Sequence, residues 1–151
     1  MAIRPTVFIP KTIVDETLNQ PAVQGKRMLE PFHALTKANK LPIDMLEDTE
    51  VVGNVEIHRH EGDLWFCLEG EATFICDGKA KDPKIREKDG VKNDLEIRAT
   101  EIVDGKEYVL KAGDWLWIPP GQPHIHKADA TARLVVIKVP TTEPAPLEEC
   151  M

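Results

Sequence analysis

Short apolar stretches separated by turn residues fill most of the chain after residue 50. Their sequences are VVGNVEIHRH, LWFCLEG, EATFICDG, LEIRATEIVDG, KEYVLKAGD, WLWIP and RLVVIKVP. Brief apolar or alternating runs bounded by glycine, proline or aspartate are typical of β-strands, and no helical pattern lies between these runs. Strands at this spacing without intervening helices predict an antiparallel sandwich or barrel.

The best helical candidate precedes these strands, at residues 25–37. The apolar residues that share one helical face there are Met28, Leu29, Phe32 and Leu35. Proline in a helix interior removes a hydrogen bond and clashes with the preceding turn, whereas proline in the first turn is tolerated. Pro31 therefore predicts a helix that is short or that begins near this residue.

Three segments depart from the strand pattern. Residues 79–94 contain six Lys/Arg, four Asp/Glu and two large apolar residues, so we expect a solvated insertion between two strands; a mobile lid over a pocket is the alternative. Residues 1–12 predict an edge strand that pairs with a second copy of the chain, which makes a homodimer the expected assembly. The tail at residues 141–151, with two prolines and three glutamates, predicts an extended segment.

Length and composition favour a single domain. A chain of 151 residues with 42% hydrophobic residues buries roughly two thirds of the surface that its unfolded form exposes. We expect one domain over residues 1–151, with a barrel core at about 50–140, an extension at 1–49 that contains the helix, and the tail at 141–151.

Charge and cysteine content narrow the classes of function. The net charge of −7 and the isoelectric point near 5.2 oppose binding to a nucleic acid, because the sequence has no concentrated basic face. No stretch approaches the ~20 apolar residues of a membrane span, and the start of the chain does not match a signal peptide. Cys67, Cys76 and Cys150 have neither C-x-x-C spacing nor the density of a disulfide scaffold, so we expect a cytoplasmic protein.

A two-residue hairpin loop is expected at Glu69-Gly70. It would place Trp65 opposite Phe74 and Asp63 opposite Cys76. The side chains that then face inward are Asp63, Trp65, Cys67, Ala72, Phe74 and Cys76. This face is apolar with an acid at one end, as small-molecule sites are, and we therefore assign Trp65, Phe74 and Cys76 to a substrate pocket.

Four of the five histidines form two His-x-His pairs, at residues 58–60 and 124–126. Side chains two residues apart on a strand point to the same face, about 6.5 to 7 Å apart along the backbone. Such a pair can supply two of the three or four ligands that a divalent transition metal needs. Asp63, which follows a turn at Glu61-Gly62, is the expected acid ligand, and Glu61 is the competing one.

These residues resemble the two signature motifs of the cupin superfamily. The residues that correspond to the first motif are Gly53, His58, His60, Asp63 and Gly70, and GDWLWIPPGQPH at residues 113–124 corresponds to the second. In that family the first motif supplies two histidines and a glutamate, the second supplies one histidine, and all four bind a metal inside a small β-barrel. The resemblance covers about residues 50–140. It implies an all-β cupin-type fold, an antiparallel double-stranded β-helix or jelly-roll barrel, with a short N-terminal helix and metal ligation by His58, His60, Asp63 and His124.

The first motif departs from the family pattern in three ways. Four residues instead of five separate Gly53 from His58, two instead of three or four separate His60 from the acid, and the acid is aspartate. The shorter spacing is similar to that of the cupin-type phosphomannose isomerases. Asp63 therefore keeps the ligand position with a shorter reach, and weaker binding, binding through water or a site of three histidines are the alternatives. Ala128 stands where the second motif often has asparagine.

The resemblance implies a metal-dependent enzyme, because a metal with three or four protein ligands keeps open positions that face the pocket. We expect a small oxygenated organic substrate that chelates the metal, with a dioxygenase-type oxidoreductase as the favoured activity. A sugar or uronate isomerase, a metal-independent epimerase and a non-catalytic small-molecule binding protein are the alternatives. Fe2+ is the favoured ion, with Zn2+, Mn2+ and Ni2+ as alternatives. His126 is the candidate general base or substrate contact, and a pocket-wall histidine without a chemical role is the alternative.

Overall fold

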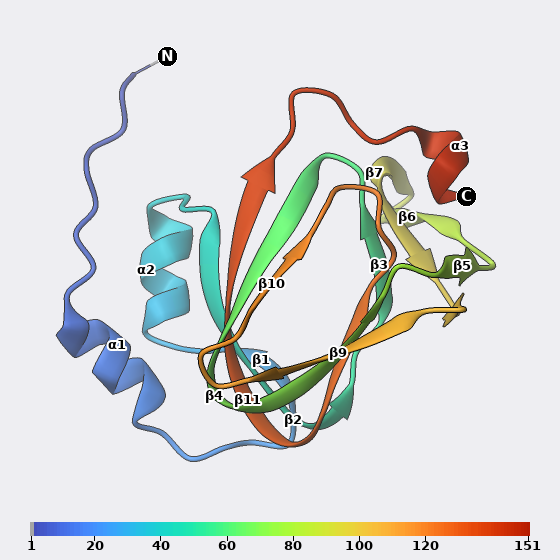
Figure 1. Cartoon of the computed structure of the whole chain (residues 1–151). Coiled ribbons are helices and arrows are strands. Elements are labelled where there is room, and N and C mark those ends of the chain that lie inside the picture. The colour runs from blue at the N-terminus through green and yellow to red at the C-terminus, as the bar shows by residue number, and fades with distance from the viewer. Residues whose placement is uncertain (1) are drawn as a thin grey trace.

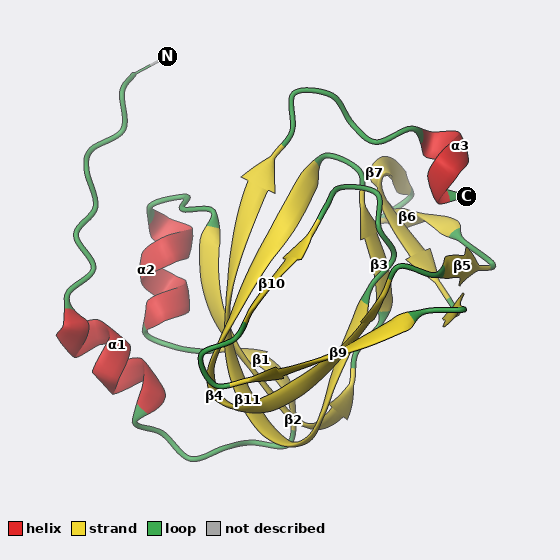
Figure 2. Ribbon diagram, in the orientation of Figure 1, coloured by secondary structure: helices red, strands yellow, loops and turns green. Residues whose placement is uncertain are grey.

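Antiparallel strands form the wall of a barrel in the computed structural model, which describes residues 2–151 (Figures 1 and 2). The larger sheet contains, in order, β1 (Gly25–Met28), β2 (Ile43–Val52), β11 (Ile125–Pro140), β4 (Glu61–Cys76) and β10 (Trp115–Ile118), and β9 (Lys106–Lys111) also pairs with β4. The second sheet contains β3 (Val55–His58), β7 (Val91–Ala99) and β6 (Lys84–Lys88), and β5 (Lys79–Lys81) pairs with β8 (Glu101–Val103). The antiparallel pairing throughout confirms the expected all-β barrel.

Alternation along β4 and β11 separates the barrel interior from the outer surface. The apolar side chains that β4 buries are Trp65, Cys67, Ala72, Phe74 and Cys76. Those that β11 adds to the same core are Ala128, Ala132, Leu134 and Val136. Because fully burying a large apolar side chain contributes about 1.5 to 3 kcal/mol, this shared core holds the two long strands together.

The predicted hairpin at Glu69-Gly70 is wrong. β4 runs through this position without reversing, and β11 pairs with both halves of it. Gly70 has a φ of +72°, and a Cβ there would lie 1.9 Å from the Thr131 carbonyl oxygen, so β4 bends closely against β11 at a residue where only glycine fits. The predicted inward face is nevertheless correct, because this bend shifts the alternation so that Cys67 and Ala72 are both buried.

Two short helices, rather than one, cover the outer face of the larger sheet. α1 (Lys11–Leu18) and α2 (Phe32–Ala38) lie on one side of the barrel (Figure 1) and pack with Met45 and Val135 in a second core. α2 begins directly after Pro31, as the sequence predicts, but the predicted helix is wrong over Gly25–Met28, which is β1. Since Pro31 interrupts the helical hydrogen bonds, the residues before it satisfy their backbone groups by pairing with β2 instead.

Three further expectations about local structure are corrected. Residues 2–10 form no strand, so the edge that suggested a homodimer is absent from this segment. The charged segment at residues 79–94 is solvated as expected, since most of its charged side chains are exposed, but it contains strands of its own, β5, β6 and the start of β7. The tail contains α3 (Leu147–Cys150), and Cys150 is buried in a small cluster with Ile57 and Ile97.

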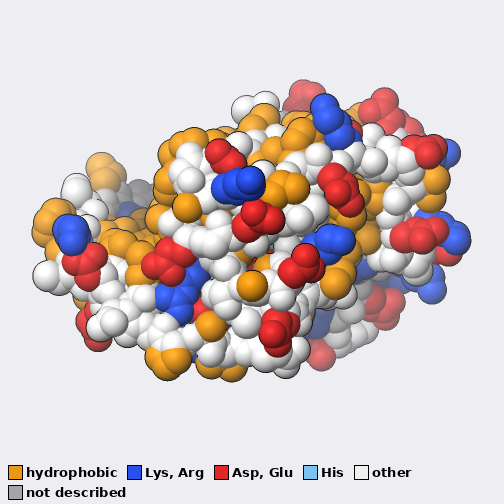
Figure 3. All heavy atoms as spheres, turned by 60° about the horizontal axis from the view of Figure 1, so that its bottom comes forward, with side chains coloured by type: hydrophobic (Ala, Val, Ile, Leu, Met, Phe, Trp, Pro, Cys, Tyr) orange, Lys and Arg blue, Asp and Glu red, His pale blue; other side chains and the backbone are white. Residues whose placement is uncertain are grey.

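Charged side chains of both signs are interspersed over the face of the molecule that Figure 3 shows. That face therefore lacks the concentrated basic area that a phosphate backbone requires. None of the helices in residues 2–151 is long and apolar enough to cross a membrane.

Candidate metal centre

The two sequence motifs lie side by side in the barrel. β3 from the first motif pairs with the segment that leads into β11: the backbones of Glu56 and His124 exchange hydrogen bonds of 2.9 and 3.0 Å, and the Gly121 N–H donates to the His58 carbonyl over 2.8 Å. Because alternate residues of a strand face the same side, Glu56 and His58 both reach the cavity that His124 enters from the second motif.

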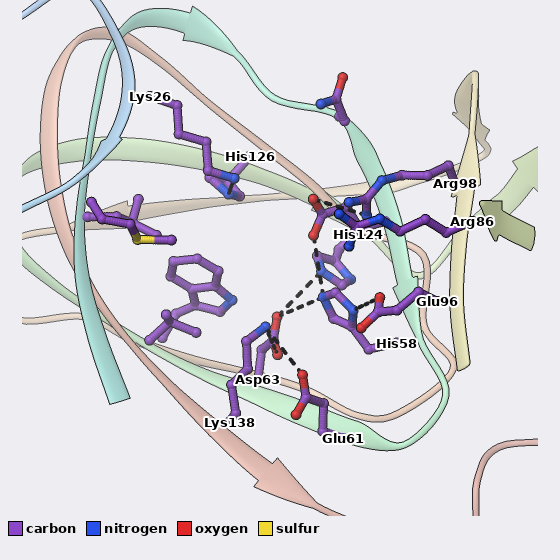
Figure 4. A pocket seen from close by; sticks show the side chains of 16 residues that line it. Lys26, His58, Glu61, Asp63, Arg86, Glu96, Arg98, His124, His126 and Lys138 are labelled. Carbon is purple, nitrogen blue, oxygen red and sulfur yellow. Dashed lines mark hydrogen bonds and ion pairs between the residues drawn. The ribbon is translucent and has the colours of Figure 1, made fainter. Parts of the chain in front are cut away.

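Four donor atoms come together inside this cavity. The His58 Nε2 lies 3.4 Å from the Glu56 Oε2 and 3.7 Å from the Asp63 Oδ2, and the His124 Nε2 lies 3.5 Å from the same Asp63 oxygen. Figure 4 shows His58, His124 and Asp63 pointing toward one another. The group joins two imidazoles with two carboxylates, and β3, β4 and the second motif each contribute to it.

Hydrogen bonds on the far side of each imidazole ring leave both Nε2 atoms free for this group. The His58 Nδ1–H donates to the Glu96 carboxylate over 2.5 Å, and the His124 Nδ1–H donates to the Gln122 carbonyl over 3.0 Å. Metal-binding histidines are usually oriented by an acceptor of this kind, which selects the tautomer with an unprotonated Nε2. Both rings are therefore held as metal ligands are held.

Asp63 divides its two oxygens between Lys138 and the histidines. The Lys138 Nζ donates to the Asp63 Oδ1 over 2.7 Å, whereas the Asp63 Oδ2 is buried and has no hydrogen-bond partner among residues 2–151. The His58 Nε2 is likewise buried without such a partner. Buried polar atoms without partners are rare in folded proteins and call for an explanation, such as an ion.

The spacing of the donor atoms fits a transition metal. Two atoms that bind one ion at about 2.1 Å lie roughly 3.0 to 3.6 Å apart for bond angles between 90° and 120°. Three of the separations within the group are 3.4, 3.5 and 3.7 Å; the first two lie within this range, and the third exceeds it slightly. The residues present therefore fit a divalent ion without rearrangement of the backbone.

The charges of the group also favour a cation where the donor atoms meet. Burial by itself lowers the pKa of His58, but the carboxylates of Glu56 and Glu96 outweigh it and raise this pKa to about 9. Burial lowers the pKa of His124 to about 4, so this imidazole is neutral at pH 7. Burial would raise the pKa of Glu56, but His58 and Arg98 hold it well below its usual range. Without a cation, His58 itself supplies the positive charge by holding a proton.

His60 does not join this group. β3 ends at His58, so the strand alternation that would have placed His60 beside it stops one residue too early. The His60 Nε2 lies 3.6 Å from Glu61 and 3.8 Å from Glu96, and His60 does not line the cavity. Glu61, the competing acid, does line the cavity and forms a second group of possible ligands with His58 and Glu96.

Glu56 is the residue that the sequence analysis missed. In the structure, Glu56-x-His58 occupies the alternate strand positions that His58-x-His60 was expected to occupy. In this frame four residues separate His58 from Asp63, which agrees with the spacing of the family motif. The signal was therefore present, in the alternation of β3 and in the distance from His58 to the acid.

The cavity around the group has a volume of about 270 Å³. Trp65 lines it, as the sequence predicts, but Phe74 and Cys76 do not. Phe74 lies behind the wall, with its ring centroid 5.1 Å from that of Trp65, and Cys76 is buried in the barrel core. Both are buried in the barrel core as expected, but neither reaches the cavity of the metal centre. A volume below the range of about 300 to 1,000 Å³ that drug-sized ligands occupy points to a small ligand.

His126 lines the same cavity and is held by a buried acid. Its Nδ1–H donates to the Asp48 carboxylate over 2.5 Å, and its Nε2 lies 3.4 Å from the Lys26 Nζ. The Trp65 ring, with its centroid 5.0 Å away, packs against the imidazole. Asp48 belongs to β2 and is 0% exposed, and no local pattern in the sequence connects it with His126.

Comparison with known proteins gives a family match to the part of the chain that contains the second motif. The Cupin domain family model matches residues 98–140, and no curated protein matches the sequence. Among solved structures, the chain resembles an oxalate oxidase (TM-score 0.48, 16% identity, 82% of this chain and 57% of that one). It also resembles the DMSP lyase DddQ from Ruegeria pomeroyi (TM-score 0.43, 18% identity, 69% of this chain and 41% of that one). A third similar structure is the CENP-C cupin domain of Drosophila melanogaster (TM-score 0.45, 13% identity, 66% of this chain and 61% of that one).

This chain spans less than two thirds of each of these three structures, and identities this low do not extend to activity. The family match over residues 98–140 includes β9, β10 and all of β11, and the second motif lies between β9 and β11. These elements close the antiparallel barrel around His58, Asp63 and His124. The match to the Cupin domain family therefore covers the part of the chain that contains the second motif and the strands on either side of it.

Proposed function

We propose that this protein is a metal-dependent enzyme that acts on a small oxygenated organic molecule. The observation that supports it is the meeting of four donor atoms, from Glu56, His58, Asp63 and His124, in one cavity. Two of these atoms, the His58 Nε2 and the Asp63 Oδ2, are buried without a hydrogen-bond partner among the described residues. Compared with the ligand set expected from the sequence, this proposal replaces His60 with Glu56.

The donor set narrows the choice of ion. Two imidazoles combined with carboxylates suit Fe2+, Mn2+, Zn2+ and Ni2+, and two histidines with one carboxylate are the ligands of non-haem iron enzymes. Fe2+ therefore remains the preferred ion. A bound divalent ion would polarise a substrate oxygen and make the hydrogens on the neighbouring carbon more acidic.

The pairing of Asp48 with His126 favours proton transfer as the reaction class. Asp48 accepts the hydrogen on the His126 Nδ1, so the His126 Nε2 carries the lone pair. This lone pair accepts a hydrogen bond from the Lys26 ammonium over 3.4 Å and would act as a base once Lys26 turns to the substrate. That nitrogen would take a proton from a substrate carbon and return it to a neighbouring atom of the substrate, as in an isomerase, or release it after an elimination, as in a lyase. Lys26, 3.4 Å from the same nitrogen, would stabilise the negative charge that the substrate develops.

A dioxygenase, the activity favoured by the sequence, is the second candidate. Its support is the combination of two histidines with a carboxylate, which is shared with non-haem iron oxygenases. The Asp48–His126 pair has no obvious role in that chemistry, whereas it supplies an oriented base for proton transfer. We therefore place the isomerase or lyase class first.

Metal analysis of matched variants tests the centre. We expect protein purified without a chelator to contain close to one transition-metal ion per chain by mass spectrometry. His58→Ala should lose this metal, and the neighbouring His60→Ala, which leaves the cavity wall intact, should retain it. Circular dichroism would verify that both variants fold. Wild-type protein without metal, or equal loss in the two variants, would contradict the proposal.

Hydrogen exchange into a substrate analogue tests the role of His126. In deuterated water, the wild-type protein should exchange the carbon-bound hydrogens of a small 2-hydroxy ketone or 2-keto acid, as followed by nuclear magnetic resonance. His126→Gln should slow this exchange by about 10²- to 10⁴-fold while the metal content stays the same. Oxygen uptake with no exchange would favour the dioxygenase, and binding with neither reaction would favour a non-catalytic binding protein.

A further inference from the structure

The wall of the metal-centre cavity contains equal numbers of basic and acidic side chains. The basic residues are Lys26, Arg86, Arg98 and Lys138, and the acidic ones are Glu56, Glu61, Asp63 and Glu96. These four positive and four negative side chains cancel, which leaves only the proton that His58 holds in the absence of a cation. A divalent ion that replaces this proton would bring the sum to +2. Opposite charges attract strongly in a partly desolvated cavity, so the loaded site would favour a negatively charged ligand.

The acidic residues already have basic partners. A Glu56 carboxylate oxygen lies 3.2 Å from the Arg98 guanidinium, and a Glu96 carboxylate oxygen lies 2.5 Å from the His58 Nδ1. The Lys138 Nζ forms ion pairs with Asp63 over 2.7 Å and with Glu61 over 3.9 Å. In contrast, neither Lys26 nor Arg86 has a carboxylate oxygen of residues 2–151 within 4.0 Å. Both side chains are solvent-exposed at the rim of the cavity, so their two positive charges are available to an anion that enters it.

Arg86 is directed to the cavity by an irregularity in β6 and β7. The register of these strands shifts between Ile85, which pairs with Ile97, and Arg86, which pairs with Asn93. Extra residues in one strand change the direction in which nearby side chains point. Figure 4 shows the side chains of Arg86 and Arg98 both extending from these strands toward the cavity. Arg98 is paired with Glu56, and Arg86 makes no ion pair or side-chain hydrogen bond with any described residue.

Trp65 adds a buried donor that lacks an acceptor. The residue lines the cavity and is 4% exposed, and its indole N–H makes no hydrogen bond with any of residues 2–151. An unsatisfied buried donor costs free energy, which an acceptor oxygen on a bound ligand would remove. Arg86 and Trp65 therefore both provide N–H groups to the cavity without acceptors of their own.

We propose that the substrate carries a carboxylate, and that Arg86 binds it. A guanidinium group offers paired N–H donors that match the two oxygens of a carboxylate. This inference rests on the proposed function, and it selects uronates and keto acids from the expected chelating substrates over neutral hydroxy-ketones and catechols. Lys26 and the Trp65 N–H supply further donors to the same anion.

Calorimetry with two probes of similar size and different charge tests this inference. Pyruvate contains a carboxylate next to a carbonyl, and hydroxyacetone is a neutral counterpart. Each would be titrated into wild-type protein, Arg86→Gln and Lys84→Gln, both without metal and with Zn2+, which has no redox chemistry. Lys84 lies on the same strand but outside the cavity wall, so its variant is a matched control for the loss of one positive charge.

We expect pyruvate to bind more tightly than hydroxyacetone, and Arg86→Gln to weaken pyruvate alone, by about tenfold. Lys84→Gln should leave both affinities unchanged. Equal binding of the two probes, or no effect of Arg86→Gln, would overturn the inference. Tighter binding of inorganic phosphate than of pyruvate would overturn the choice of a carboxylate. If Zn2+ does not bind at all, the proposed metal centre fails, whereas an effect of Arg86→Gln on pyruvate in the metal-free protein still supports the anion site.

Discussion

The backbones of Glu56 and His124 exchange two hydrogen bonds, although the residues belong to motifs that are far apart in the sequence. This pairing aligns the two motifs, so that an acid of β3 and a histidine of the second motif face one cavity. His58 and Asp63 complete the group. The ligands that we propose from the first motif are thus a glutamate and a histidine in alternate positions rather than two histidines.

Glu56→Gln should lower metal affinity by about 100-fold or more, because it replaces an anionic ligand with a neutral one. The loss of a residue that only hydrogen-bonds to a ligand typically lowers metal affinity by about 10- to 100-fold, and losing a ligand should have a larger effect. Competition with a chelating dye would measure the affinity. Glu87→Gln, at an exposed position of β6 outside the cavity wall, is the control and should have no effect. If Glu56→Gln binds metal as tightly as the wild type, Glu56 serves only as the partner of Arg98.

Glu96 is expected to position His58 without binding the ion itself. Glu96→Ala removes the acceptor of the His58 Nδ1–H and should weaken metal binding by about 10- to 100-fold. Glu96→Gln retains an acceptor oxygen and should recover most of that affinity, a rescue that distinguishes orientation from charge. Equal losses in the two variants would instead indicate that the charge of Glu96 matters.

Gly70→Ala should destabilise the barrel more than Gly90→Ala. Both glycines have a positive φ, +72° and +77°, but only a Cβ at Gly70 would meet a neighbour, the Thr131 carbonyl oxygen at 1.9 Å. The left-handed backbone alone costs an alanine about 1 to 2 kcal/mol, so Gly90→Ala measures this cost and the excess in Gly70→Ala measures the clash. Guanidinium denaturation would provide both values. Similar losses for the two variants would mean that β4 and β11 separate easily at this bend.

The cysteines should react slowly in the folded protein. Cys67, Cys76 and Cys150 are free and buried, and burial, together with the nearby Asp77, raises the pKa of Cys76 to about 12. At pH 8 only about one Cys76 thiol in ten thousand would then be the reactive thiolate. Ellman's reagent should therefore detect almost no thiol before unfolding and three per chain afterwards. A rapid reaction of one thiol in the native protein would contradict this burial.

Much of the fold could be predicted because its strands alternate. The apolar and polar positions of β4 identify its inner face whether or not the chain reverses at Gly70. Whether Glu69-Gly70 forms a turn or a bend depends on pairing with β11, which is distant in the sequence, and no local pattern encodes that choice. The same limit applies to β1, whose residues pair with β2 and do not continue the helical pattern.

The sequence predicted the site residues that lie on regular strands. It did not predict correctly the residues just beyond the end of β3. His58, Asp63, His124 and His126 all reach the cavity. His60 does not reach it, because β3 ends at His58 and the strand alternation stops there. The next residue, Arg59, donates a hydrogen bond from its side chain to the Ala145 carbonyl over 2.7 Å. Asp48 could not be assigned from sequence, since it pairs with the remote Ala132. Arg86 pairs with the nearby Asn93, but its direction depends on a register shift that no local pattern indicates.

The donor atoms of the centre are divided between the two sheets. Glu56 and His58 belong to the smaller sheet, and Asp63 belongs to the larger one, which β11 joins just after His124. Apart from the cavity, few backbone hydrogen bonds connect these parts, the exchange between Glu56 and His124 among them. An ion bound by residues of both sheets would act as a non-covalent cross-link at this seam. The amide hydrogens of Glu56 and His124 would then exchange with solvent more slowly in the loaded protein than in the empty one.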